Sequence, residues 1–262
     1  MNFAWMAACA ALLVAWATGA AAHDTWFEPL APLSSAPGDA NFALGTGNRF
    51  PLTELAVDSK YFAQSGCRTA DGAARPLKTL RYTDQATQLR VRAADAARLS
   101  CFVQLEPFEF DLPPDKIEIY FKEIRPGAAV LAAWADLRAR GLPFHERYTK
   151  SARIDGAHAA PQPVGTAMDV LRTAPAGPLT VGAEAVFQVL REGRPLADFA
   201  VELVNERSPV GLWQRTDAQG RIRARLPLPG RWLLRGTDLR LSAGDATTWE
   251  SQFITYAFEV GR

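Results

Sequence analysis

His23 is the residue whose type and position point most directly to chemistry, because it follows a segment typical of a cleaved signal peptide. Residues 4–17 are apolar, and three alanines at 20–22 come directly before His23. Cleavage after Ala22 would give His23 a free α-amine beside its imidazole, and nitrogen donors of this kind suit Cu, Ni and Zn. The sequence therefore predicts a metal-chelating site that only proteolysis creates. The alternative is that His23 is simply the residue that follows the leader.

Further metal ligands must come from a small set, because the chain contains only three histidines. No His-x-His or Glu-x-x-His spacing occurs, so the fold must assemble any metal site. We rank His145, which follows a predicted helix, above His158, which lies in a glycine- and proline-rich connector. Asp24 and Glu28 are close enough in sequence to His23 to supply oxygen atoms. The predicted metal ligands are His23, His145, Asp24 and His158, and each lone histidine is equally compatible with an ordinary surface or core position.

The leader and the charge balance indicate the compartment and exclude one class of partner. The apolar run of the leader is shorter than the about 20 residues of a membrane span, so we expect cleavage, export and a soluble periplasmic protein. An uncleaved anchor is the alternative, since no Lys or Arg precedes the apolar run. Lys and Arg total 29 and Asp and Glu total 28, which gives a formal net charge of +1. This balance provides no field to attract nucleic acid.

The cysteines predict one disulfide. Cys9 lies in the leader, which leaves Cys67 and Cys101 in the exported chain. An even pair in an exported protein favours a disulfide, and two thiolate metal ligands are the alternative. On the chain-entropy model, closing this loop would stabilise the fold by roughly 3–4 kcal/mol.

The hydrophobic pattern predicts a mainly β protein with two β-sandwich-like parts and one helix after the first. Residues 117–121 alternate as a half-buried strand does. Pro126 and apolar residues at three- and four-residue steps predict a helix at about 126–140. The expected organisation is a signal peptide at 1–22, an N-terminal β-rich domain with the helix at 23–154, a linker at 155–178, and a C-terminal β-sandwich at 179–262.

Motifs of common catalytic sites do not occur in the sequence, so we expect a binding protein rather than an enzyme. There is no Gly-x-Ser-x-Gly elbow. The Gly-Thr-Gly-Asn segment at 45–48 lacks the lysine of a phosphate-binding loop. Trp213 and Trp249 lie in less regular stretches and are candidates for an exposed aromatic surface, with burial in the core as the alternative.

The C-terminal part resembles transthyretin-like and carboxypeptidase-regulatory-like β-sandwiches, which also belong to the immunoglobulin-like class of architecture. The residues that carry this resemblance are Gly-Arg-Pro-Leu-Ala at 193–197, Thr-Asp-Ala-Gln-Gly at 216–220, and Pro-Gly-Arg-Trp at 229–232. The resemblance implies a fold, and such a fold mostly serves as a scaffold or binding module.

The whole exported chain resembles a family of exported bacterial proteins of unassigned function, once associated with periplasmic accessory proteins of nickel and cobalt uptake. The matching blocks are Ala-His-Asp-Thr-Trp-Phe-Glu-Pro at 22–29, Glu-Arg-Tyr-Thr-Lys-Ser-Ala-Arg at 146–153, and Trp-Glu-Ser-Gln-Phe-Ile-Thr-Tyr-Ala-Phe-Glu-Val at 249–260. Only His23 corresponds to the family feature that the resemblance connects with metal.

These observations favour a periplasmic accessory protein that binds a divalent transition metal (Ni, Co or Cu) through His23 and delivers it to a membrane uptake system. One alternative is a metal-free module of the cell envelope that binds a protein or glycan through its sandwich loops. A second alternative is a copper redox enzyme built on the same terminal histidine.

Overall fold

The computed structural model of the protein describes residues 23–31 and 37–262. The predicted signal peptide, residues 1–22, lies outside the described residues. The chain is mainly β, as the sequence predicts.

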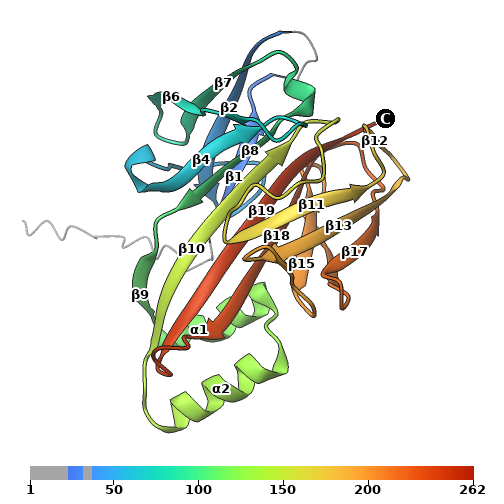
Figure 1. The fold of residues 1–262 in the computed structure, drawn as a ribbon. Helices are drawn as coiled ribbons and strands as arrows, with labels where there is room; N and C mark the ends of the chain where they lie inside the picture. The colour runs from blue at the N-terminus through green and yellow to red at the C-terminus, as the bar shows by residue number, and fades with distance from the viewer. Residues whose placement is uncertain (1–22, 32–36) are drawn as a thin grey trace, which may run out of the picture.

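In the described part of the chain the strands form three sheets, here called the N-terminal, central and C-terminal sheets (Figure 1). The N-terminal sheet has the order β1 (Asp24–Pro29), β2 (Gly38–Gly47), β7 (Thr87–Ala93) and β6 (Lys78–Tyr82), with β3 (Leu55–Ala56) on β2. The central sheet has the order β16 (Leu212–Arg215), β15 (Ala200–Asn205), β18 (Gly230–Leu241), β19 (Thr248–Gly261), β10 (Phe144–Asp155), β8 (Ser100–Leu105), β4 (Phe62–Arg68) and β5 (Ala74–Arg75). Two short strands extend it, β12 (Leu179–Thr180) on β19 and β9 (Phe108–Leu112) on β10. The C-terminal sheet has the order β11 (Met168–Ala174), β13 (Glu184–Arg191) and β14 (Arg194–Pro195), with β17 (Arg221–Arg225) on β13.

Two hydrophobic cores lie on opposite faces of the central sheet, because neighbouring residues of a strand point to opposite sides. On β19, Ala257 belongs to the core under the N-terminal sheet, whereas Tyr256 and Phe258 belong to the core under the C-terminal sheet. On β18, Leu233 and Leu234 divide in the same way. The central sheet is therefore shared by two sandwich-like halves, which confirms the predicted fold class.

Helices α1 (Pro114–Ile124) and α2 (Ala128–Ala139) lie at one end of the central sheet, the lower end in Figure 1. Helix α2 corresponds to the helix predicted at 126–140. The strand predicted at 117–121 is wrong, because these residues belong to α1. The buried residues of α1 are Ile117, Tyr120 and Ile124, which follow a helical period, and Pro114 occupies the first turn, where proline is favoured. In the described part of the chain, no helix is both long and apolar enough to cross a membrane.

A third core joins the helices to the central sheet. Phe144 of β10 and Trp249 and Phe253 of β19 pack with Ile117 and Leu137 of the helices. Trp249 and Phe253 are an even number of residues from Ala257, so the helices cover the same face of the central sheet as the N-terminal sheet does. The region between the helices and the N-terminal sheet, along this face, is called the seam below.

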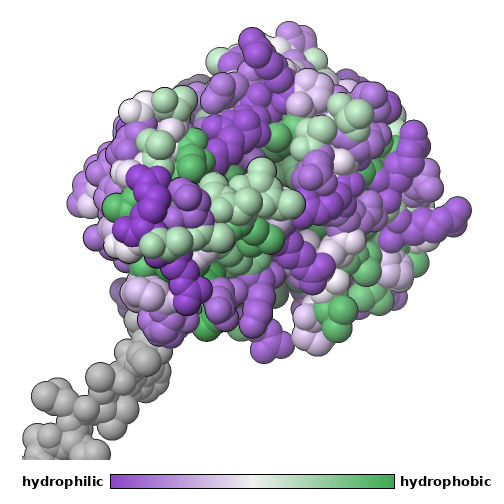
Figure 2. Space-filling view, turned by 90° about the horizontal axis from the view of Figure 1, so that it is seen from below, coloured by the Kyte–Doolittle hydropathy of each residue, from purple (hydrophilic) through white to green (hydrophobic). Residues whose placement is uncertain are grey.

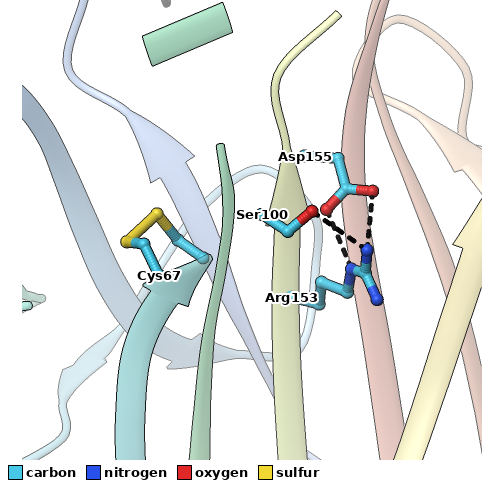
Figure 3. Close-up of a disulfide and its surroundings, with 5 residues drawn as sticks. Cys67, Ser100, Arg153 and Asp155 are labelled. Atoms are coloured by element: carbon cyan, nitrogen blue, oxygen red, sulfur yellow. Dashed lines mark hydrogen bonds and ion pairs between the residues drawn. A yellow bond between two sulfur atoms is a disulfide. The ribbon is translucent and has the colours of Figure 1, made fainter. Parts of the chain in front are cut away.

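The segment predicted as a linker at 155–178 is attached to the central sheet by a buried arginine. Arg153 is 1% exposed, and its guanidinium donates to Asp155 at 2.8 Å, Asp169 at 2.8 Å and Ser100 at 3.1 Å. Figure 3 shows Arg153, Asp155 and Ser100 side by side. The segment also contributes β11. The central sheet contains strands from both sides of this segment.

The predicted disulfide between Cys67 and Cys101 is present and joins β4 to β8 (Figure 3). The two cysteines are register partners in adjacent antiparallel strands, and both are buried in the core under the N-terminal sheet. The bond therefore fastens β4, which lies next to the edge strand β5, to the strand beside β10.

Candidate functional site

His23 lies in the seam, at the start of β1, and the strand that carries it is fixed on both sides. Asp24 and the residues that follow pair with β2, starting from the pair Asp24 and Gly47. Trp26 and Phe27 are each 1% exposed. The Thr255 hydroxyl on β19 donates to the carbonyl of Thr25 and so ties β1 to the central sheet.

Two arginines of β18 fasten β1 through pairs of carboxylates. The Arg235 guanidinium donates to Asp24 Oδ2 and to Glu202 Oε2, each at 2.7 Å. Four residues earlier, Arg231 repeats the arrangement. It donates at 2.7 Å both to Glu28 and to Glu206. Asp24 and Glu28 are four residues apart on β1, as Arg231 and Arg235 are on β18. Residues four apart on a strand share a face and lie about 13 Å apart, so the two pairs match. These two groups are called the Arg235 triad (Asp24, Arg235, Glu202) and the Arg231 triad (Glu28, Arg231, Glu206).

Burial controls the electrostatics of the Arg235 triad. It raises the pKa of Asp24 above its usual value, and the adjacent Arg235 charge only partly offsets this effect. Burial also opposes the charge on Arg235, but the Asp24 and Glu202 carboxylates outweigh it and raise the pKa of the guanidinium. The Asp24 carboxylate, which the sequence predicts as a metal ligand, is therefore engaged with a permanent cation in this structure. Glu28 is engaged in the same way with Arg231.

The imidazole of His23 is partly exposed and faces a carboxylate. Its Nε2 is 4.0 Å from Glu54 Oε2, and the side chains are 32% and 46% exposed. Asn48 Nδ2 donates to the same Glu54 oxygen at 3.1 Å, and the Glu54 amide donates to the Thr46 carbonyl at 2.8 Å. The loop between β2 and β3 thus presents Glu54 to the histidine ring.

Two glycines allow this loop to approach β1. A Cβ on Gly47 would lie 2.4 Å from the Leu52 carbonyl oxygen and 2.9 Å from the Trp26 ring. A Cβ on Gly45 would lie 2.6 Å from both the Gln85 carbonyl oxygen and Thr53. The Gly-Thr-Gly-Asn segment therefore serves close packing beside His23.

The main-chain carbonyl of His23 accepts a hydrogen bond from the Lys150 ammonium of β10. Burial lowers the pKa of Lys150, and the nearby Asp24 and Glu146 carboxylates act in the opposite direction. The ammonium also lies over the Tyr148 and Phe253 rings, at 5.5 and 5.6 Å from their centroids.

A cavity of about 100 Å³ opens beside Asp24 in the seam. Trp213, a predicted aromatic surface residue, is half-buried here, and the Arg125 guanidinium lies 4.1 Å from the centre of its ring. The lining residues are Asp24, Asn48, Glu123, Ile124, Trp213, Arg235, Gly236 and Thr237. The other tryptophan prediction is wrong as an exposed surface: Trp249 is 0% exposed and stacks on Phe144, because β19 turns it into the core under the helices.

Deeper in the seam, Glu146 is a buried carboxylate. Tyr120 donates to Glu146 Oε1 at 2.8 Å, and Ser251 donates to the same oxygen. The second oxygen, Oε2, has no hydrogen-bond partner among the described residues. Burial raises the pKa of Glu146, and the hydrogen bonds from Ser251 and Tyr120 only partly counter it.

The structure does not bring the other two histidines to His23. His145 is the second residue of β10 and precedes Lys150 by five residues, about 16 Å along the strand. Its Nδ1 lies 2.7 Å from Asp111 Oδ1. His158 follows the other end of β10, where its amide donates to the Ala97 carbonyl at 2.7 Å. Among residues 23–31 and 37–262, no group of three His, Cys, Asp or Glu side chains is arranged to hold a metal ion.

The sequence analysis missed Glu54 and Lys150 as neighbours of His23. Glu54 is 31 residues away along the chain and Lys150 is 127 residues away. Only the pairing of β2 with β3 and the packing of β1 on β10 bring them to the histidine. The single signal for Lys150 is its place in the block at 146–153 that carries the family resemblance.

A family model described as "Domain of unknown function (DUF4198)" matches residues 20–237. No curated protein matches the chain. Among solved structures, the D0–D1 domain of intimin aligns with 89% of this chain and 97% of that chain, at 7% sequence identity and a TM-score of 0.20.

Proposed function

The chain belongs to the DUF4198 family, and we propose that its exported form binds a divalent transition metal (Ni, Co or Cu) through the α-amine and imidazole of His23. It would then deliver the metal to a membrane uptake system, in line with the nickel and cobalt association of the family it resembles. The observation that carries the proposal is the partly exposed imidazole of His23 in the seam, opposite the Glu54 carboxylate.

Chelation assigns a different role to each nitrogen of the ring. The α-amine and Nδ1 of an N-terminal histidine close a six-membered ring around a metal, whereas Nε2 cannot reach the same ion. Nε2 is the atom that faces Glu54. A carboxylate that accepts from the second nitrogen of a metal-bound histidine orients the ring and increases its basicity. Glu54 is therefore proposed as an orienting residue and not as a ligand.

The anchoring of β1 supports the same proposal. The Arg235 and Arg231 triads and the Thr255 hydrogen bond hold the strand on the central sheet. A terminal residue on a fixed strand loses little conformational freedom when it binds a ligand, so less of the binding free energy is lost to ordering.

Metal titration of three matched chains tests the proposal. The first chain begins at His23, and the second begins at the same position with the substitution His23→Ala. The third has one additional alanine before His23, which keeps the imidazole but moves the terminal amine to another residue. Calorimetry with Cu(II) or Ni(II) is expected to show full affinity for the first chain alone. Its affinity should fall with decreasing pH, because both nitrogens must lose protons. His145→Ala serves as a control that keeps the site, and equal affinity in the His23→Ala chain would refute the proposal.

The second candidate function is a metal-free module of the cell envelope that binds another protein. The observation that favours it is the exposure of large apolar side chains at the helical end of the molecule: Ile119 and Leu131 are 45% and 47% exposed. Seen from below, the surface shows hydrophobic residues among hydrophilic ones (Figure 2). If no metal binds the chain that begins at His23, this function becomes the better account.

A further inference from the structure

The hydrogen bond from Lys150 to the His23 carbonyl bears on which atoms of His23 a metal can use. An N-terminal histidine offers three donors within reach of one ion: the α-amine, Nδ1 and its own carbonyl oxygen. The amine and the carbonyl close a five-membered ring, and with the imidazole they occupy one face of an octahedral ion. Of these donors, the His23 carbonyl accepts a hydrogen bond from a positively charged group in the structure.

Lys150 is held in this position by its surroundings. The Asp24 and Glu146 carboxylates lie near enough to attract the ammonium. The Tyr148 and Phe253 rings lie beside the ammonium.

We propose that Lys150 is a positioning residue that withholds the His23 carbonyl oxygen from a bound metal, so that the site presents two nitrogens and no oxygen from this residue. The inference rests on the proposed function at His23. Under this inference the site selects nitrogen-preferring ions, Cu(II) and Ni(II), because ions such as Mn(II) and Mg(II) bind preferentially through oxygen. An oxygen-preferring ion would need the His23 carbonyl oxygen in addition to the two nitrogens, and Lys150 blocks that oxygen.

Lys150→Met tests the inference, since methionine fits beside the two aromatic rings but donates no hydrogen bond. We expect the ratio of Cu(II) to Mn(II) affinity to fall about tenfold, the usual size of an effect from a residue that contacts a ligand group. The ratio is the informative quantity, because loss of the ammonium charge favours all divalent ions alike. Electron paramagnetic resonance of the Cu(II) form should then report an added oxygen ligand.

Two further variants complete the experiment. Lys150→Arg keeps both the charge and the donor and should restore the wild-type ratio and spectrum. Lys150→Gln keeps an N–H donor, and it replaces the methionine variant if that chain does not fold, with a smaller expected change in the ratio.

The possible outcomes separate this inference from the proposed function. An unchanged spectrum and ratio in Lys150→Met, with binding still dependent on His23, would overturn the role of Lys150 alone. Equal binding of Cu(II) by the wild-type and His23→Ala chains would overturn the proposed function, and the inference with it. A changed ratio that Lys150→Arg restores supports the assignment.

Discussion

Replacing Arg235 by Met should destabilise the protein by about 3 kcal/mol, because the change leaves two buried carboxylates without their cation. The side chains of Asp24 and Glu202 are 9% and 10% exposed, and both lie 2.7 Å from the guanidinium. Removing one partner of a buried ion pair costs about 3–5 kcal/mol. The 32% exposure of Arg235 places the expected loss at the lower end of that range. This loss is roughly a hundredfold in the folding equilibrium constant.

Arg231→Met is the matched control, because it removes the same chemistry four residues away on the same strand. Arg231 is 37% exposed, and its partners Glu28 and Glu206 are 18% and 20% exposed. Solvent screens these charges more, so the expected loss is about 1 kcal/mol. Urea unfolding of both variants at neutral pH measures the difference, provided that the denaturant slope stays constant. Equal losses in the two variants, or a loss below about 1 kcal/mol for Arg235→Met, would refute the reasoning about burial.

Three other changes give separate tests. Gly47→Ala should cost about 2 kcal/mol because a Cβ meets backbone there, whereas Gly38→Ala on the same strand, with nothing within 4 Å, should be close to neutral in thermal unfolding. The pKa of Glu146 is raised above its usual 4.5, so its contribution to stability is fully present below that pH and is lost as the pH rises through the folded pKa. The melting temperature of wild type should therefore fall relative to that of Glu146→Gln as the pH rises above 4.5, and parallel profiles would contradict this. Replacing both Cys67 and Cys101 by Ala should lower stability by about 3–4 kcal/mol, and an unchanged unfolding midpoint in urea would exclude that contribution.

The sequence predicted the general fold because its signals are local. Turn motifs and alternating strands indicate a mainly β chain, and an even pair of cysteines in a chain with a predicted leader indicates the disulfide between Cys67 and Cys101. The segment at 117–121 was misassigned because Ile-Glu-Ile alternates over three residues, while its helical period becomes visible only when Tyr120 and Ile124 are counted together. A short alternating run fits either period, and tertiary packing decides between them.

The candidate site depended on contacts that the sequence does not encode locally. The motif around His23 drew attention to Asp24 and Glu28 as sources of oxygen. In the structure these carboxylates bind Arg235 and Arg231, more than 200 residues away along the chain. The same long-range packing brings Glu54 and Lys150 to the histidine, so the neighbours of His23 could not be named before the fold was known.

Native mass spectrometry of the protein exported by its own host tests the central claim most directly. The measurement reports the first residue and any bound metal on the same molecule. The account predicts a chain that begins at His23 and carries one Ni, Co or Cu ion, which is lost in the His23→Ala variant. A chain that begins at another residue, or one that begins at His23 and binds none of these metals on titration, would contradict it.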